Sequence, residues 1–420
     1  MVLTGTCHMS TKHLLILNSL VFIILGTYIF KMFDFPLMPD LRSRISKTQN
    51  DDDQKYYDII RIMPNDAQLY KSTKQAITTN SWLGDSYGSE EPLYARSTCP
   101  TPLQNQLGKL DWPGGKFLPS VPVLLWSQHA TPEVYARLAP HHRSMGWYGR
   151  TLSDVSEALQ LLKEKENRVL LDLPSNKQPQ DNHCITCAVV GNGGILRKSA
   201  QGKNIDAHDY VFRMNAAIIK GYEQDVGTRT THYFFSRNGL GNAKGLYRKA
   251  GFTFPPISNE TRYVFIPVHD KDYYLVKAVA LNRLVDKGPD ISKSVMFFFG
   301  TTVNAKKIKM MHPDFLRYLR NRIMPKKNLA QEKPDIYRPS TGAVAIFAAL
   351  YSCDKVSILG FLTENSNNFS SYYFDRTYSK YTYPADHSFT QEKTLWKRLH
   401  DAGVLQLFTR SDAPVWLANP

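Results

Sequence analysis

The chain has 420 residues, 42% of them hydrophobic and 12% aromatic, which is enough to bury a full core and argues against a disordered or fibrous protein. Lysine and arginine exceed aspartate and glutamate by 15, which favours anionic partners. The basic residues are scattered and form no arginine-rich stripe, so composition gives no support to nucleic-acid binding.

An uncharged apolar run, Leu14–Phe30, lies near the N-terminus between Lys12 and Lys31. It is long enough to span a thin bilayer, at the short end of the usual ~17–25 residues. Because no small-x-small cleavage site follows, we predict an uncleaved transmembrane signal anchor over residues 13–31 behind a tail of residues 1–12. Basic residues flank the run on both sides, so the positive-inside rule leaves its orientation undecided.

Residues 32–95 are polar, carry the charge run "NDDDQK" and show little periodic apolar pattern, which predicts a stem. We place one folded domain over residues 96–420. The aromatic and proline-punctuated stretch "LDWPGGKFLPSVPVLL" indicates its edge.

From about residue 150 strand-like and helix-like segments alternate. Strands are predicted at 184–190, 209–215, 231–236, 262–268, 294–300, 355–361 and 404–410, and helices at 151–165, 312–324, 340–352 and 388–403. This order predicts an α/β fold with a Rossmann-like, largely parallel sheet covered by helices on both faces. Ligands of such sheets bind at the carboxyl ends of the strands, where the topology changes direction.

A glycine-rich turn, Gly191–Gly194, follows the strand predicted at 184–190 and precedes a helical pattern. Glycines there would let the backbone approach a nucleotide phosphate at a helix N-terminus. A tight strand-to-helix turn explains the same residues equally simply. Leu196 stands where G-x-G-x-x-G has its last glycine, which disfavours a plain dinucleotide site.

The helix predicted at 340–352 has a similar start. Ser340 is a good N-cap, and Thr341 and Gly342 sit in the first turn, so hydroxyl and backbone donors gather at a positive helix end. The alternative is a well-capped buried helix with no ligand.

His387 stands immediately before the helix predicted at 388–403, where Ser388 and Gln391 suggest a capping box. The helix dipole disfavours imidazolium at this place, and a neutral imidazole is what a general base needs. The alternative is a histidine that packs or faces solvent. Glu392 could orient the ring or the helix, or be an ordinary first-turn carboxylate.

Two further stretches have a chemical and a structural interpretation. Tyr372 and Tyr373 could donate to phosphate oxygens, although aromatic runs more often belong to a core or an edge strand. Asp270 and Asp272 form the Asp-x-Asp pattern with which many nucleotide-sugar transferases hold a divalent metal against a diphosphate. Surface carboxylates are the simpler explanation of that pattern.

Five cysteines are present, of which one, Cys7, precedes the apolar run. The other four, Cys99, Cys184, Cys187 and Cys353, predict two disulfides in an oxidising compartment, with the pairing open. A thioredoxin-like or zinc site at the Cys-x-x-Cys is disfavoured, since no second cysteine or histidine pair exists to complete four zinc ligands. Asn259 and Asn368 begin glycosylation sequons, consistent with a lumenal domain.

Two long stretches carry a family resemblance. The sequence "CAVVGNGGILRKSAQGKNIDAHDYVFRMNAAIIKGYEQDVGTRTTHYFF" resembles the large sialyl motif of eukaryotic sialyltransferases, and "PSTGAVAIFAALYSCDKVSILGF" resembles their small motif. "YYFD" matches the third motif, and His387 with Glu392 matches the H-x-x-x-x-E of the last. Within the family, "NIDAHDYVFRMN", "IKGYEQDVGTRT", "MMHPDF" and "LWKRLHDAGVLQL" most resemble the N-acetylgalactosaminide α2,6-sialyltransferases that act on O-linked GalNAc of glycoproteins.

The resemblance implies a type II Golgi membrane protein whose single lumenal domain has a GT-A-like variant fold and needs no metal or other cofactor. It thereby favours surface carboxylates at Asp270 and Asp272. It also implies a disulfide between Cys187 and Cys353, which leaves a second one between Cys99 and Cys184.

Carried over to this chain, the family's functional residues divide between two substrates. Asn192 and Asn215 would contact the cytidine monophosphate part of the donor CMP-sialic acid, and Ser340, Thr341 and Gly342 would hold its phosphate and carboxylate. His387 would be the base that activates a mucin-type glycoprotein acceptor for one inverting displacement. Tyr372 and Tyr373 would stabilise the departing phosphate, although related members often have histidine in place of Tyr372.

Three alternatives stay open at this stage. The chain could be a sialyltransferase of another acceptor or linkage class, such as N-glycans or gangliosides. It could be a catalytically silent lumenal protein that binds glycans or nucleotides. It could also be a metal-dependent glycosyltransferase that uses Asp270 and Asp272.

Overall fold

The structure is a computed structural model that describes residues 86–93, 97–172, 183–325, 337–382 and 386–411. The predicted tail, anchor and nearly all of the stem lie outside these residues. Within the described ranges, no helix combines the length and apolar character that crossing a membrane requires. All the described residues belong to one compact unit.

In the described part of the chain, seven strands form one parallel sheet in the order β5-β4-β3-β2-β1-β6-β7. The strands are β1 Thr186–Val190, β2 Tyr210–Met214, β3 His232–Phe235, β4 Arg262–Phe265, β5 Ile308–Met310, β6 Lys355–Leu359 and β7 Gln406–Leu407. The chain builds outward from β1 on one side and then returns to add β6 on the other. The direction therefore changes between β1 and β6, which places the expected ligand crevice at their carboxyl ends.

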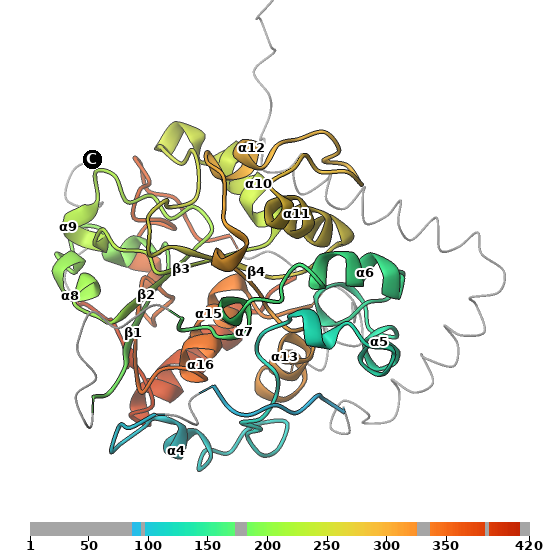
Figure 1. The fold of residues 1–420 in the computed structure, drawn as a ribbon. Helices are drawn as coiled ribbons and strands as arrows, with labels where there is room; N and C mark the ends of the chain where they lie inside the picture. The colour runs from blue at the N-terminus through green and yellow to red at the C-terminus, as the bar shows by residue number, and fades with distance from the viewer. Residues whose placement is uncertain (1–85, 94–96, 173–182, 326–336, 383–385, 412–420) are drawn as a thin grey trace, which may run out of the picture. The chain divides into compact units, whose positions relative to one another are not determined.

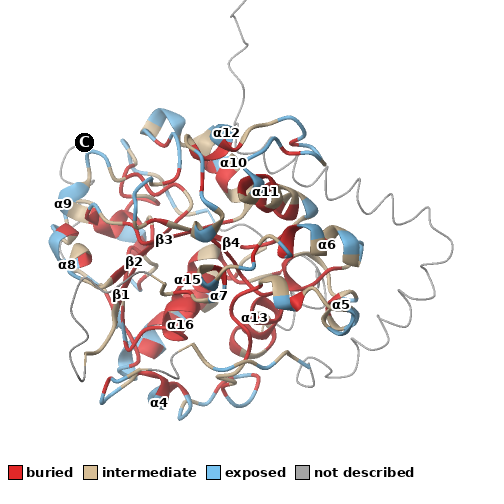
Figure 2. Ribbon diagram, viewed as in Figure 1, coloured by how far each residue is buried: buried red, intermediate tan, exposed pale blue. Residues whose placement is uncertain are grey.

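Helices cover both faces of the sheet, as the alternation of buried strand residues requires (Figure 1). Val189 and Phe212 pack into one core with α4 (Gln104–Leu107), α13 (Pro313–Tyr318), α15 (Thr341–Leu350) and α16 (Phe389–Asp401). Ala188 and Val211 pack into a second core with α6 (Leu152–Leu159), α10 (Arg237–Leu246), α11 (Asp270–Leu281) and α12 (Val295–Phe299). Figure 2 shows α15 as buried almost throughout, as its alanine-rich sequence suggests.

The helices are α4 Gln104–Leu107, α5 Pro132–Leu138, α6 Leu152–Leu159, α7 Lys165–Arg168, α8 Gly202–Asp206, α9 Glu223–Val226, α10 Arg237–Leu246, α11 Asp270–Leu281, α12 Val295–Phe299, α13 Pro313–Tyr318, α15 Thr341–Leu350 and α16 Phe389–Asp401. A π-helical turn, Leu319–Ile323, continues α13. The predicted parallel α/β sheet with helices on both faces is confirmed.

The strand predicted at 294–300 is wrong, because this segment is the helix α12. Ser294 caps it by accepting a hydrogen bond from Phe297 N, and Gly300 ends it with a left-handed φ of 71°. Its buried residues have helical spacing, since Val295, Phe298 and Phe299 are buried whereas Met296 and Phe297 are exposed. The neighbouring strand β5 was not predicted, because the middle of its three residues is a lysine, Lys309, which is buried and paired with Asp172 at 3.0 Å.

Both expected disulfides are present. Cys187 is bonded to Cys353, with their Cα atoms 6.1 Å apart, and Cys99 to Cys184 at 4.6 Å. The first bridge joins β1 to the residue two positions before β6. It therefore fastens the two strands between which the sheet changes direction.

The packed domain begins before residue 96, where the sequence placed its edge. Gly88 N donates to Asp314 Oδ2 over 2.9 Å, and Glu90 Oε1 lies 2.7 Å from His129 Nε2. Gly88 and Glu90 of the predicted stem thus already contact α13 and the 3₁₀ turn Ser127–His129. Asn259 and Asn368, which begin the two sequons, are exposed.

Candidate active site

The glycine-rich turn after β1 is a backbone packing site. Its N–H groups donate to carbonyl oxygens of the protein itself: Gly191 to Leu359 over 2.7 Å, Gly193 to Gly360 over 2.9 Å and Gly194 to Ser370 over 3.1 Å. A Cβ on Gly194 would lie 2.1 Å from the Ser370 carbonyl oxygen, so close approach requires glycine there. The residues that follow form a single 3₁₀ turn, Gly194–Leu196, so no long helix begins at this point. Of the two interpretations of this turn, these contacts favour the tight turn, because the three glycine donors are already bonded within the protein.

Asn192 and Asn215 nevertheless lie at the carboxyl ends of the neighbouring strands β1 and β2, and both are partly exposed. Asn192 Nδ2 donates to Met214 O over 3.1 Å, which ties the two strand ends together. Asn215 adopts a left-handed φ of 52°, which asparagine tolerates better than most residues. The structure thus brings the two predicted donor-binding residues to one edge of the sheet.

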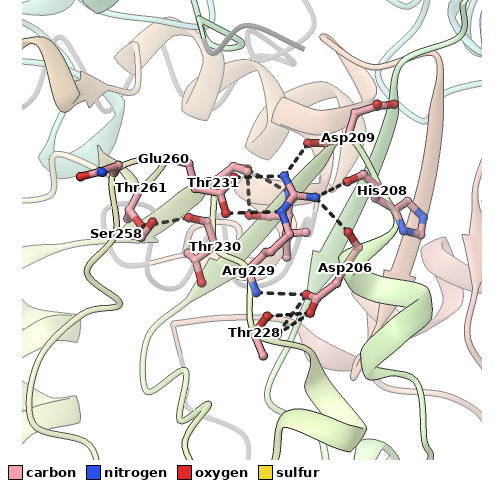
Figure 3. Close-up of polar contacts among 12 residues, drawn as sticks. Asp206, His208, Asp209, Thr228, Arg229, Thr230, Thr231, Ser258, Glu260 and Thr261 are labelled. Carbon is pink, nitrogen blue, oxygen red and sulfur yellow. Dashed lines mark hydrogen bonds and ion pairs between the residues drawn. The ribbon is translucent and has the colours of Figure 1, made fainter. Parts of the chain in front are cut away.

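Much of the remaining large motif holds the fold together (Figure 3). The Asp206 carboxylate accepts hydrogen bonds from Thr228 N, Thr228 Oγ1 and Arg229 N, at 2.8 to 3.0 Å. The Arg229 guanidinium donates to three carbonyl oxygens and pairs with Glu260, and a Cβ on Gly227 would lie 2.4 Å from Asp206 Oδ1. These contacts fix the loop between α9 and β3, so the length of the motif reflects structural as well as binding requirements.

The start of α15 is organised by a carboxylate from another helix. Ser340 Oγ accepts from Ala343 N over 3.1 Å, which confirms the predicted N-cap, and donates to Glu392 Oε2 over 2.7 Å. Ser340 N donates to Glu392 Oε1 over 3.0 Å. Burial raises the pKa of Glu392 to about 7, although both bonds from Ser340 oppose this shift.

The hydroxyl proton of Ser340 is therefore committed to Glu392. The donors that remain at this helix end are the N–H groups of Thr341 and Gly342, which have no carbonyl partner within a helix that begins at Thr341. Thr341 is partly exposed, and a Cβ on Gly342 would meet the Phe361 ring at 2.8 Å.

His387 lies beside the same segment. Its Nδ1 is 2.9 Å from the carbonyl oxygen of Arg338, and because a carbonyl can only accept, Nδ1 carries the proton and Nε2 carries the lone pair. Burial, assisted by the Arg338 cation, lowers the pKa of His387, while Asp386 acts in the opposite direction. The neutral tautomer held in this way can accept a proton at Nε2.

The predicted capping box before α16 is wrong. The Ser388 side chain makes no capping hydrogen bond, and the Gln391 amide donates to Pro325 O and accepts from Tyr337 instead. Glu392 contacts Ser340 rather than the His387 ring. Glu392, five residues after His387, thus joins the starts of α15 and α16. The spacing of residues within one helix could not reveal this contact.

The two adjacent tyrosines have different environments. Tyr373 is 1% exposed and its hydroxyl donates to Ile218 O over 2.6 Å, and burial raises the pKa of this hydroxyl. Tyr372 is partly buried, with its ring stacked 5.1 Å from Phe374 and edge-on to Tyr247. Tyr373 already has a hydrogen-bond partner for its hydroxyl, and Tyr372 lies at the rim of the core.

Asp270 and Asp272 do not form a paired carboxylate site. Asp270 is ion-paired with Arg150 at 2.7 Å, while buried Asp272 accepts from the backbone N–H groups of Arg237, Val268 and His269. Asp272 thereby anchors the first turn of α11 to the start of α10. In the part of the chain that the structure describes, no cluster of three or more His, Cys, Asp or Glu side chains suits a metal ion.

The sequence model of "Glycosyltransferase family 29 (sialyltransferase)" matches residues 124–404, well over half of the chain, including every segment of the site. The chain belongs to this family of sialyltransferases. It is 39% identical to the human protein named alpha-N-acetylgalactosaminide alpha-2,6-sialyltransferase 2 over 345 residues, which cover 82% of this chain and 89% of that protein.

This sialyltransferase is also similar to the human protein named alpha-N-acetylgalactosaminide alpha-2,6-sialyltransferase 1, at 36% identity over 75% of this chain and 52% of that protein. Among solved structures, one titled "Crystal Structure of a Mammalian Sialyltransferase" aligns with 77% of this chain and 100% of its own, at 22% identity and a TM-score of 0.46.

Proposed function

We propose that the protein transfers sialic acid from CMP-sialic acid to the 6-hydroxyl of GalNAc O-linked to serine or threonine of glycoproteins, forming an α2,6 linkage. Family membership and the names of its relatives support the activity and the acceptor class. The observation that carries the chemistry is the bond between His387 Nδ1 and Arg338 O, which leaves the Nε2 lone pair for the acceptor proton.

The reaction then proceeds as one displacement. His387 Nε2 takes the proton of the acceptor hydroxyl while the hydroxyl oxygen bonds to C2 of sialic acid. The bond from C2 to the phosphate oxygen breaks, and its electron pair leaves with CMP. Attack and departure on opposite sides of C2 invert its configuration.

The donor would lie along the carboxyl edge of the sheet. We assign Asn192 and Asn215 to the cytidine monophosphate part, and the N–H groups of Thr341 and Gly342, at the positive end of α15, to the phosphate and carboxylate. Ser340 would act by shaping this helix end, since its hydroxyl serves Glu392.

The phosphate would be stabilised as it departs by protein donors alone. Tyr372, at the rim of the aromatic cluster, would donate its hydroxyl, and Tyr373 would support the site from within the core. We further propose that no metal or other cofactor takes part, and that the net charge of +15 favours the anionic donor.

We also propose a Golgi membrane protein of type II, anchored by residues 13–31 with the catalytic domain in the lumen. The two disulfides are consistent with an oxidising compartment, and the exposed Asn259 and Asn368 are accessible for glycosylation. Protease protection of the domain in sealed vesicles, with its loss on adding detergent, tests this orientation.

Transfer from labelled CMP-sialic acid by the full-length chain tests the function, with GalNAc-only mucin, asialo-mucin and an N-glycoprotein as parallel acceptors and EDTA present. Product on the mucins alone, resistant to an α2,3-specific sialidase, is expected. Product on the N-glycoprotein alone would overturn the acceptor class. Activity abolished by EDTA and restored by a divalent cation would overturn the metal-free mechanism, and a folded chain that binds CMP without any transfer would be a silent binder.

A further inference from the structure

Two charged side chains flank the proposed base, and the mechanism above uses neither of them. Asp386 Oδ2 lies 3.7 Å from His387 Nε2, which is too far for a hydrogen bond but close enough for a strong electrostatic interaction. The same oxygen lies 2.8 Å from an Nη of Arg338. A carboxylate therefore stands next to the atom that would receive the proton, and a guanidinium holds it there.

The backbone of Arg338 fixes this arrangement from both sides. Arg338 N donates to Asp386 O over 3.0 Å, and Arg338 O accepts from His387 Nδ1 over 2.9 Å. The Asp386 and His387 side chains are 17% and 14% exposed, so solvent screens their interaction only in part. The Arg338 backbone sets the tautomer of the base, while its side chain sets the position of the carboxylate.

The other charges near the base come from three separate segments. Burial lowers the pKa of His269, which stands just before α11, and the nearby cations Lys271, Arg143, Arg338 and Arg150 lower it further. Arg143 also lowers the pKa of Asp386, less than Arg338 and His387 do. On α16 itself, Glu392 is directed toward Ser340. Burial alone would raise the pKa of Asp386, but Arg338 and then His387 bring it below its ordinary value. Asp386 is thus an ionised carboxylate within a cationic surrounding.

We propose that Asp386 is a positioning residue of the transfer reaction, and that Arg338 opposes it. The Asp386 carboxylate stabilises the positive charge that the His387 imidazole acquires when it takes the acceptor proton, whereas the Arg338 guanidinium disfavours that charge. The pair adjusts the basicity of Nε2 without touching the substrate. This inference rests on the proposed role of His387 as the base.

The two substitutions act in opposite directions, which a purely structural role does not predict. Asp386→Asn removes the anion, so the acidic limb of kcat/KM should move to lower pH by about one unit. Its kcat at the plateau should fall by on the order of tenfold, since a less basic imidazole is a weaker base. Arg338→Gln removes the cation while leaving its backbone contacts possible, so the same limb should move to higher pH by about one unit.

The experiment measures pH–rate profiles of the full-length wild type and both variants, with CMP affinity as the measure of an intact donor site. A matched control is the exposed pair Lys397 and Asp401 on α16, whose side chains lie 2.7 Å apart. Lys397→Gln and Asp401→Asn make the same chemical changes away from the base and should leave the profile unmoved. Asp386→Glu should retain most of the wild-type profile.

Titration of the His387 ring by NMR in the same proteins measures the ring pKa directly, independently of turnover. The His387→Gln variant assigns the signal. We expect the ring pKa to fall in Asp386→Asn and to rise in Arg338→Gln. Shifts in the same direction, or no shift in either variant, would overturn the inference. If the wild type transfers no sialic acid, the proposed function fails, and opposite ring titration shifts would then support the charge coupling while removing its catalytic meaning.

Discussion

The turn after β1 and the start of α15 both lie at the carboxyl edge of the sheet and have similar sequences. They differ in the partners of their backbone N–H groups. After β1, the N–H groups of Gly191, Gly193 and Gly194 are all bonded to protein carbonyls. At the start of α15, Ser340 and Glu392 fasten the cap, and the first-turn N–H groups of Thr341 and Gly342 point out of a helix end. Glycine content is therefore a poor guide to anion binding, and the destination of each N–H is the better one.

This difference favours a structural role for the turn after β1 and a catalytic role for the start of α15. The turn after β1 joins β6 and the tyrosine segment through backbone contacts, which favours a role in stability. The start of α15 also carries Arg338, whose carbonyl holds His387, which favours a role in chemistry. Substitutions in the two regions should accordingly affect different measurements.

The largest effect is expected when the histidine held beside α15 is removed. His387→Ala should lower kcat by ~10²–10⁴-fold, because a general base typically contributes this much, while CMP binding measured by calorimetry is retained. His208→Ala in the large motif is the matched control, since its ring contacts Asn204 O and Ser357 Oγ and lies outside the proposed site. Near-normal turnover of His387→Ala would contradict the assignment of the base.

A matched pair of glycines compares how tightly the turn after β1 and the start of α15 are packed. Gly194→Ala places a Cβ 2.1 Å from the backbone oxygen of Ser370, so the free energy of unfolding should fall by roughly 3 kcal/mol or more. Gly342→Ala meets the Phe361 ring at 2.8 Å, a side chain that can move, and alanine is favoured in a helix. Its loss should be smaller. Denaturant unfolding measures both, and an equal or greater loss in Gly342→Ala would remove the distinction.

Glu392 should give the start of α15 a pH-dependent stability. Its pKa is raised from 4.5 to about 7, so the folded protein binds this proton more tightly than the unfolded chain. The resulting stabilisation is complete below about pH 4.5 and is lost as the pH rises through about 7. It amounts to on the order of 3 kcal/mol.

Comparison with Glu392→Gln isolates this contribution from other titrating groups. Between pH 5 and 7.5 the free energy of unfolding should decline more steeply in the wild type than in the variant. Parallel curves for the two proteins would show that Glu392 is ionised normally in the folded state.

The smallest effects are expected at two adjacent tyrosines, of which Tyr373 should affect stability and Tyr372 should affect turnover. Tyr373→Phe leaves the buried Ile218 carbonyl without its donor and should cost about 1–3 kcal/mol of stability with little change in kcat. Tyr372→Phe should leave stability unchanged within ~0.5 kcal/mol and lower kcat by about tenfold. The reverse pattern would show that Tyr373 is the phosphate contact.

Most of the fold could be predicted from periodicity, because buried parallel strands such as β1 and β2 form apolar runs bounded by turns. The prediction failed where local chemistry overrode composition. The aromatic segment of α12 has the composition of a strand, but its Ser294 cap and the left-handed Gly300 at its end make it a helix. Strand β5 has a lysine at its centre whose partner, Asp172, is far away in the sequence.

The site was predictable to the extent that it lies in contiguous motifs. His387, Ser340 and both cysteine pairs follow from the residues together with the family resemblance. The contact of Glu392 with Ser340 and that of Arg338 with Asp386 join residues 52 and 48 positions apart. Such pairs depend on how α15 and α16 pack together, which no local pattern reports.

The bridge between Cys187 and Cys353 also determines when the central strand can be completed. The two residues are separated by 166 positions, so β1 leaves the ribosome long before its neighbour β6 exists. Until then one edge of β1 is unpaired, and Cys187 has no native partner. A chain that terminates before Cys353 therefore cannot close its sheet, and a prematurely truncated product is expected to be recognised as unfinished by the quality control of the cell.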